Sequence, residues 1–254
     1  MSTSWVSRPE RRTGRARALA AAAGAVAGLI AGGSPPAAAP GCAADAMLVF
    51  DGSASMAEVA YDVTKAPRIA EARAALRRAL PGIAAVRDVG LLTYGPGGGD
   101  SCTGITLRVP PGPQTTGAVI AAVEALEPGG LTPLAASVAR AAEALDYRAR
   151  PGVVVLVTDG DETCGGRPCA LGARLAATGA DLQVHVIGFR IVDDIFRWNS
   201  PEAEGYAGPT VAKCLADATG GLYVSTRTVD ELVRALERTL GCPVIGATGG
   251  RRRG

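Results

Sequence analysis

The stretch from Met47 to Met56 reads M-L-V-F-D-G-S-A-S-M and joins an apolar run to a group of oxygen-bearing side chains. The apolar run has the length of a buried parallel strand, and Asp51-Gly52 is a turn signal that ends it. Asp51, Ser53 and Ser55 follow at every second position, so one carboxylate and two hydroxyls can converge on one point. Such hard oxygen ligands suit Mg²⁺ and do not suit Zn²⁺. The stretch therefore predicts half of a magnesium site at the end of a buried strand.

Outward from this stretch, apolar runs alternate with amphipathic segments along the chain. Strands that alternate with helices predict a mostly parallel sheet covered by helices on both faces. The segment 104–109 alternates apolar and polar residues, as a half-exposed edge strand does, and it can pair with 89–94 as a hairpin. The strands are expected at 47–50, 89–94, 104–109, 153–157, 182–189 and 221–225, and the helices at 67–80, 116–127, 133–145, 169–178, 210–219 and 231–240.

Two helix ends carry specific expectations. The helix over 67–80 has Ile69, Leu76 and Leu80 on one face, and its arginines are expected on the opposite, solvent-facing side. The last helix is expected to be capped by Asp230.

Composition favours one exported globular domain. The chain has 254 residues and a net charge of +2, which is enough length for one large α/β domain and too little charge to indicate a nucleic acid or an anionic membrane as a partner. Residues 1–39 combine a basic start, an apolar Ala-rich stretch and a small-residue cleavage site near Ala39, which is typical of a signal peptide. The domain is then expected over 40–243, and the Gly/Arg tail 244–254 is expected to be disordered.

The apolar stretch of the leader is short for a transmembrane helix, and no other segment is long and apolar enough to span a membrane. We therefore expect an exported protein that ends in the periplasm, on the cell surface or in the medium. A lipid anchor on Cys42 is a second possibility, although Ala39-Pro40-Gly41 lacks the aliphatic residue that such a site usually has.

The six cysteines of an exported chain predict disulfides, for which fifteen pairings are formally possible. Cys42 and Cys242 flank the domain and could tie its two ends together. Cys164 and Cys169 bracket a loop short enough to close locally, which leaves Cys102 with Cys214 by elimination. A buried unpaired thiol is the alternative for Cys214, which shares the apolar side of its helix with Val211 and Leu215.

Two further oxygen ligands stand at the ends of other segments. Thr132 lies in G-G-L-T-P-L before a helix, and Asp159 follows the most apolar strand, in V-T-D-G. In open α/β sheets the ligand crevice forms outside the carboxyl ends of the strands, where the strand order reverses. We expect both residues to reach this crevice together with Asp51.

With these pieces in order, the chain resembles the von Willebrand factor type A family, whose metal-ion-dependent adhesion site uses D-x-S-x-S, a distant Thr and a distant Asp. The resemblance covers roughly residues 45–240. It implies a Rossmann-like doubly wound six-stranded sheet of order 3-2-1-4-5-6 with one antiparallel edge strand. It also implies that Mg²⁺ or Mn²⁺ binds at Asp51, Ser53, Ser55, Thr132 and Asp159.

The resemblance implies a recognition role: few of the ligands are anionic, so the metal stays electrophilic and a carboxylate from a partner protein can complete its shell. No nucleophile or proton shuttle is evident beside these residues, so we do not expect an enzyme. The long loop 190–209 carries Phe196, Trp198 and Tyr206, which are candidates for the partner-binding surface. Family members can couple ligand binding to sliding of the last helix, and a Cys42–Cys242 bond would restrict such a slide.

Other interpretations stay open for each piece. Asp51-Gly52 and Asp159-Gly160 could be simple turns, and Thr132 could be the N-cap of a helix that begins with Pro133. Asp161 and Glu162 are expected to be solvated loop charges. His185, the only histidine, is expected to be a hydrogen-bonded core residue. A disulfide-stapled domain with a vestigial metal site is a further alternative.

An enzymatic alternative comes from the stretch Asp159 to Thr163, which fits the D-x-D-x-T opening of haloacid-dehalogenase-type phosphatases. Asp193-Asp194 would supply their later acids, and Asp159 would be the nucleophile beside Asp161. This alternative lacks the expected lysine, places the first motif late in the domain and leaves the D-x-S-x-S stretch unexplained.

Overall fold

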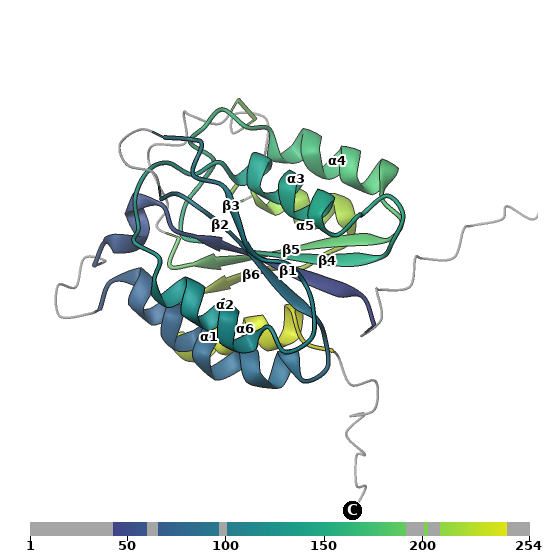
Figure 1. Cartoon of the computed structure of the whole chain (residues 1–254). Helices are drawn as coiled ribbons and strands as arrows, with labels where there is room; N and C mark the ends of the chain where they lie inside the picture. The colour runs from purple at the N-terminus through teal and green to yellow at the C-terminus, as the bar shows by residue number, and fades with distance from the viewer. Residues whose placement is uncertain (1–42, 60–65, 97–100, 192–200, 203–208, 243–254) are drawn as a thin grey trace, which may run out of the picture. The chain divides into compact units, whose positions relative to one another are not determined.

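The computed structural model describes residues 43–59, 66–96, 101–191, 201–202 and 209–242. Within these residues six strands form one sheet of order β3-β2-β1-β4-β5-β6, in which β3 runs antiparallel to β2 and the other neighbours run parallel (Figure 1). This is the fold class and strand order expected from the sequence. The strands are β1 (Asp45–Asp51), β2 (Val89–Tyr94), β3 (Thr106–Val109), β4 (Gly152–Thr158), β5 (Leu182–Phe189) and β6 (Tyr223–Thr226).

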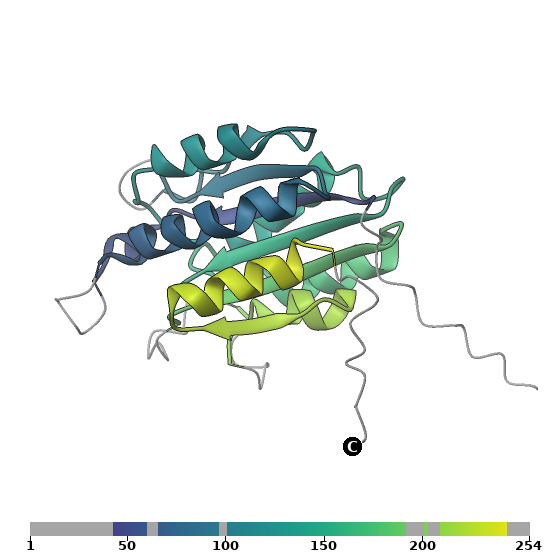
Figure 2. The ribbon, with the colours of Figure 1, turned by 90° about the horizontal axis from the view of Figure 1, so that it is seen from below.

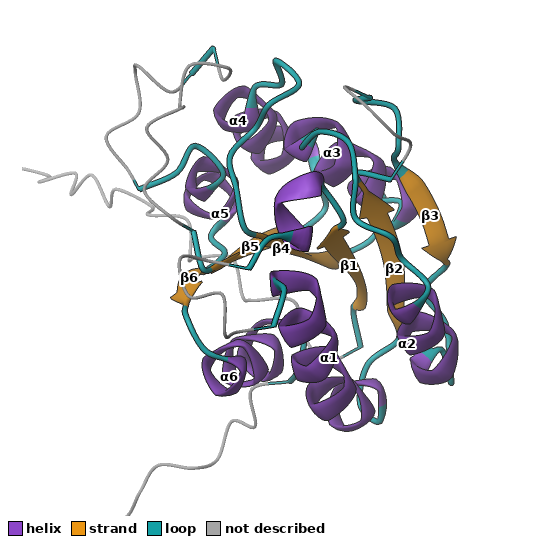
Figure 3. Ribbon diagram, turned by 90° about the vertical axis from the view of Figure 1, so that its left-hand side faces the viewer, coloured by secondary structure: helices purple, strands orange, loops and turns teal. Residues whose placement is uncertain are grey.

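The helices cover both faces of the sheet, as Figure 3 shows in a view turned from that of Figure 1. On one face α1 (Arg68–Ala84) lies between α2 (Thr116–Glu124) and α6 (Val229–Thr239) (Figure 2). The other face holds α3 (Leu134–Ala144), α4 (Pro168–Thr178) and α5 (Lys213–Thr219). A short 3₁₀ helix, η1 (Ala54–Ala57), follows β1 directly.

The alternation of side chains along β1 explains why two helix layers are needed. Leu48 and Phe50 belong to the core under α1, α2 and α6, whereas Met47 and Val49 belong to the core under α3, α4 and α5. All four side chains are buried because successive residues of a strand point to opposite faces. A central strand that is apolar from Ala46 to Phe50 therefore has no solvent face, and Asp51 stands at its carboxyl end.

Some helix ends differ from the sequence expectations. The last helix begins at Val229, and its N-cap is Thr228, whose hydroxyl accepts from the Glu231 N–H while the Glu231 carboxylate accepts from the Thr228 N–H. This reciprocal pair satisfies two helix-end donors, which a cap at Asp230 would not do, so the expected cap was wrong by two residues. The preceding helix, α5, begins at Lys213 and not at Thr210.

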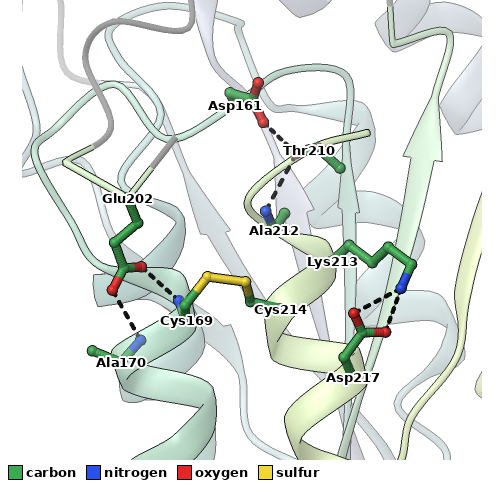
Figure 4. The surroundings of a disulfide bond; sticks show 9 residues. All are labelled: Asp161, Cys169, Ala170, Glu202, Thr210, Ala212, Lys213, Cys214 and Asp217. Atoms are coloured by element: carbon green, nitrogen blue, oxygen red, sulfur yellow. Dashed lines mark hydrogen bonds and ion pairs between the residues drawn. A yellow bond between two sulfur atoms is a disulfide. The ribbon is translucent and has the colours of Figure 1, made fainter. Parts of the chain in front are cut away.

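The disulfide pairing also differs. The structure joins Cys102 to Cys164 and Cys169 to Cys214, so the expected pairs Cys164–Cys169 and Cys102–Cys214 are wrong. Cys169 lies in the first turn of α4, which packs against α5 and its Cys214 (Figure 4), and Cys164 lies in the preceding loop. Both bonds join segments that are distant in the chain and meet in the fold, whereas the expected Cys164–Cys169 bond would have closed a short local loop. Cys214 is therefore bonded and not a free buried thiol.

Both ends of the described domain lie at the amino ends of the strands. The Ala46 N–H donates to the Asp88 carbonyl oxygen at 2.9 Å, and the Cys242 sulfur lies 3.9 Å from the Val86 carbonyl oxygen. The carboxyl end of β1, with Asp51, is the opposite end of the strand.

Several expectations fall outside the described residues. These are the leader 1–39, the tail 244–254, Cys42 and its bond to Cys242, the acids Asp193 and Asp194, and the aromatic residues Phe196, Trp198 and Tyr206. Among the helices that the structure describes, none combines the length and apolar character needed to cross a membrane.

Candidate metal centre

The site begins at the carboxyl end of β1, where the chain turns back over the sheet. The Gly52 N–H donates to the Tyr94 carbonyl oxygen at 2.9 Å, and a Cβ at Gly52 would lie 2.8 Å from that oxygen and from Leu126 Cδ2. Only glycine permits so close an approach. The Ser53 N–H then donates to Asp51 Oδ1 at 2.7 Å, which holds the carboxylate over the turn.

The other carboxylate oxygen of Asp51 is held from the neighbouring strand. Because β1 and β4 are paired, with Phe50 beside Val157, the next residues of the two strands also come together. The Thr158 hydroxyl donates to Asp51 Oδ2 at 2.7 Å, and the Asp159 N–H lies 3.4 Å from the same oxygen. Asp51 is thus fully buried and oriented by protein donors on both of its oxygens.

The two serines connect Asp51 to Asp159. The hydroxyls of Ser53 and Ser55 lie 3.0 Å apart, and the Ser55 hydroxyl donates to Asp159 Oδ1 at 2.7 Å. Ser53 and Asp159 are buried and Ser55 is half-buried. Four of the five expected ligands therefore form one hydrogen-bonded cluster that bridges the ends of β1 and β4.

Thr132, the fifth expected ligand, lies in the loop before α3, which backbone contacts hold on both sides. The Gly130 carbonyl accepts from the Ala54 N–H at 3.2 Å. On the other side the Thr132 N–H donates to the Thr163 hydroxyl at 2.8 Å, and the Thr163 N–H donates to the Thr132 carbonyl at 3.1 Å. The loop is thus attached to the 3₁₀ turn that carries Ser55 and to the segment that follows Asp159.

The expectation that Thr132 might serve only as a helix cap does not describe this structure. Helix α3 begins at Leu134, its N-cap position is Pro133, and that position makes no side-chain cap bond. The Glu162 carboxylate takes this role instead: its Oε2 accepts from the Ala135 N–H at 2.9 Å and its Oε1 from the Cys164 N–H at 2.8 Å. A carboxylate at a helix N-terminus accepts hydrogen bonds from N–H groups that have no partner within the helix, and its negative charge interacts favourably with the helix dipole.

Glu162 was therefore wrongly expected to be a solvated loop charge, since it is only 1% exposed. Asp161 is half-exposed and accepts a hydrogen bond from the Thr210 hydroxyl (Figure 4). This contact directs the Asp161 carboxylate to the segment before α5, whereas Asp159 bonds to Ser55. The two acids of the phosphatase alternative thus have separate partners.

One residue of the site was missed altogether. Arg68, the first residue of α1, was expected with the other arginines on the solvent side, yet it is 6% exposed. Its Nη1 lies 3.0 Å from Asp159 Oδ2 and donates to the Ser55 carbonyl oxygen at 3.0 Å. The available signal was its place in the chain, because the helix that follows the D-x-S-x-S turn must begin near the same edge of the sheet.

The two carboxylates of the cluster influence each other. Burial and the negative charge of Asp51 raise the pKa of Asp159 above its ordinary value, and the Ser55 hydrogen bond and the Arg68 charge oppose this rise. Tyr94, paired with Asp51 across β1 and β2, is fully buried, and burial together with the Asp51 charge raises its pKa well above the ordinary value. Two buried carboxylates side by side are a local excess of negative charge that a cation would relieve.

The donor set fits a hard divalent cation. Asp51, Ser53, Ser55, Thr132 and Asp159 offer only oxygen atoms, two of them in carboxylates. Mg²⁺ is bound in this way, through one or two carboxylates, and it keeps several waters. Among the described residues there is no cluster of three or more His, Cys, Asp or Glu side chains placed to hold a metal ion, as a zinc site would need.

His185 lies away from this site and matches its expectation. It is buried in β5, and its Nδ1 accepts from the Leu222 N–H at 2.9 Å. It is a core histidine with a hydrogen-bond partner.

Comparison with known sequences agrees with this geometry. Residues 46–162 match the family model described as the von Willebrand factor type A domain. A curated relative, the uncharacterized protein YwmD of Bacillus subtilis, is 37% identical over 116 residues, which cover 44% of this chain and 46% of YwmD. The chain thus matches less than half of the length of that relative.

Solved structures of low sequence identity share the fold. An aerotolerance-related membrane protein from Bacteroides fragilis superposes with a TM-score of 0.55 at 20% identity, covering 78% of this chain and 98% of that one. The pilus adhesin SpaC from Lactobacillus rhamnosus GG gives 0.58 at 17% identity over 78% of this chain and 30% of its own. A von Willebrand factor type A protein from Catenulispora acidiphila gives 0.54 at 18% identity, over 78% and 42%.

Proposed function

We propose that this chain, which carries a von Willebrand factor type A domain, is a non-enzymatic interaction module that binds Mg²⁺ or Mn²⁺ and, through it, an acidic residue of a partner protein. The observation that carries the proposal is the hydrogen-bonded cluster of Asp51, Ser53, Ser55 and Asp159 beside the Thr132 loop. These residues come from three separate segments, and a simple turn would need none of the contacts between them.

The residues have distinct tasks in this proposal. Asp51 and Asp159 supply the negative charge that attracts the cation, and the hydroxyls of Ser53, Ser55 and Thr132 supply neutral oxygen ligands. A bound Mg²⁺ or Mn²⁺ supplies a positive centre that accepts one more oxygen ligand from outside. Thr158 and the Ser53 N–H keep the Asp51 carboxylate oriented, so the protein does not have to rearrange this ligand.

Export is part of the proposal. The two disulfides within the described residues are typical of proteins that fold in an oxidising compartment. The fold is also that of SpaC, a pilus adhesin. Together with the leader 1–39, these observations support a protein of the periplasm, the cell surface or the medium, with a lipid anchor at Cys42 as the alternative route.

The test is a thermal melt of the mature protein in EDTA, Mg²⁺ and Mn²⁺, beside Asp51→Ala and Asp161→Ala. A cation that binds only the native state raises Tm, and we expect a rise in the wild type and in Asp161→Ala but none in Asp51→Ala. If Asp51→Ala responds and Asp161→Ala does not, the phosphatase interpretation holds instead. A wild type without any metal response would overturn the metal-dependent mechanism.

A further inference from the structure

The metal centre contains a built-in cation. Arg68 Nη1 lies 3.0 Å from Asp159 Oδ2 and 3.3 Å from Glu58 Oε2, and the Arg68 side chain is 7% exposed. The Asp159 side chain is fully buried, whereas the Glu58 side chain is 68% exposed. The guanidinium is thus buried between the buried carboxylate of Asp159 and the solvent-exposed carboxylate of Glu58.

The Arg68 guanidinium is a delocalised positive charge. The buried carboxylates of Asp51 and Asp159 alone would balance a divalent cation and leave the loaded site neutral. Arg68 adds one positive charge to these buried groups, so the buried part of the site carries an excess positive charge once a divalent cation is bound. Glu58 offsets only part of this excess, because its carboxylate is exposed and solvent screens its charge. A single carboxylate from outside would then bring the site to neutrality.

A buried charge of this kind acts strongly, because little water screens it. The Arg68 guanidinium repels an incoming divalent cation and attracts an incoming anion. Arg68 also donates to the Ser55 carbonyl oxygen, so it could instead be only a brace for the turn. The two roles predict opposite changes in metal affinity when Arg68 is replaced. Loss of a brace weakens both metal and anion binding, whereas loss of a positive charge strengthens metal binding and weakens anion binding.

We propose that Arg68 is a charge-setting residue of the metal centre, which lowers its affinity for the divalent cation and raises the affinity of the loaded site for one carboxylate. This inference rests on the proposed function, since it attributes the preference of that same site for an acidic partner to the charge of Arg68. Arg68 itself is too buried to contact the partner; it acts through the charge that it adds.

The experiment measures two affinities in the full mature chain. Free Mn²⁺ is followed by electron paramagnetic resonance to obtain the Mn²⁺ affinity, and acetate is titrated into the Mn²⁺-loaded protein while the relaxation of water protons reports its binding. For Arg68→Gln we expect Mn²⁺ to bind about tenfold more tightly and acetate to bind about tenfold more weakly than in the wild type.

Two further variants keep the test decisive. Arg78→Gln removes the same charge from α1 at an exposed position paired with Asp230, and it should change neither affinity. Glu58→Gln removes an exposed counter-charge of Arg68, so it should shift both affinities in the reverse direction, by about twofold because solvent screens it. This variant answers the question even if Arg68→Gln does not fold.

The outcomes separate the inference from the function on which it rests. If Arg68→Gln weakens both Mn²⁺ and acetate binding, Arg68 is a brace and the inference fails while the metal site stands. If neither Arg68→Gln nor Glu58→Gln changes an affinity, the inference fails in the same way. A wild type that takes up no Mn²⁺ would overturn both.

Discussion

At the scale of single residues, two charged side chains that the sequence pattern predicts at the surface are buried in the fold. Glu162 and Arg68 were both expected to face solvent, because charged side chains are rarely buried without a partner. In the structure each has partners: Glu162 accepts from two backbone N–H groups, and Arg68 pairs with Asp159. The Ala135 N–H and Asp159 are distant in the chain from Glu162 and Arg68, so these contacts leave no trace in local periodicity.

Replacing Glu162 by Ala should therefore destabilise the protein more than the loss of a loop charge would. The variant leaves the N–H groups of Ala135 and Cys164 without their acceptor inside the fold. We expect the free energy of unfolding in urea to fall by about 2–3 kcal/mol. Asp161→Ala is the matched control, with an expected loss below about 1 kcal/mol at its half-exposed site. Equal losses in the two variants would contradict the capping role of Glu162.

At the scale of elements, the sequence was most informative where periodicity is strong. The apolar run of β1, the turn at Asp51-Gly52 and the alternation of strands and helices predicted the sheet and the place of its candidate site at the carboxyl ends of the strands. The resemblance to a family supplied the strand order. The pairing of cysteines was not predictable, because Cys169 and Cys214 meet only through the packing of α4 on α5.

The other disulfide, Cys102–Cys164, lies beside the two segments that hold the Thr132 loop. The Leu131 N–H donates to the Ser101 carbonyl at 3.3 Å, and Thr163 bonds to Thr132 on the other side. Ser101 and Thr163 are the neighbours of Cys102 and Cys164, which are joined by a disulfide. This bond therefore links the two segments between which the Thr132 loop lies.

Replacing both Cys102 and Cys164 by Ser should loosen the Thr132 loop and weaken Mn²⁺ binding. The matched control is the double replacement of Cys169 and Cys214, whose bond connects α4 to α5. Each pair spans tens of residues, so each double variant should lose up to about 4 kcal/mol of unfolding free energy. Titration with Mn²⁺ should then separate them: equal Mn²⁺ affinities would show that the Cys102–Cys164 bond does not position Thr132.

At the scale of the whole molecule, stability depends on a buried histidine as well as on the core. Burial, together with the positive charges of Arg87 and Arg238, lowers the pKa of His185 to about 4 from an ordinary value of 6.5. Above pH 6.5 the residue is neutral in the folded and the unfolded chain. As the pH falls toward 4, only the unfolded chain takes up the proton, so the folded state loses stability.

We expect this effect to lower the unfolding free energy by up to roughly 3 kcal/mol between pH 6.5 and pH 4. Urea denaturation of the wild type and of His185→Gln at several pH values in this window provides the measurement. Glutamine keeps an acceptor for the Leu222 N–H and does not titrate, so the difference between the two proteins should shrink as the pH falls. Parallel curves would contradict the assignment of this pH dependence to His185.

The two ends of the described domain also have a mechanical consequence. Ala46 and Cys242 contact neighbouring residues, Asp88 and Val86, at the amino ends of the strands. Asp51 stands at the far end of β1, about 17 Å from Ala46 at the usual rise per residue of a strand. Tension applied between residues 46 and 242 would therefore act across one end of the sheet only. The candidate metal centre lies outside that line of force, so such tension would leave the proposed ligand site undisturbed.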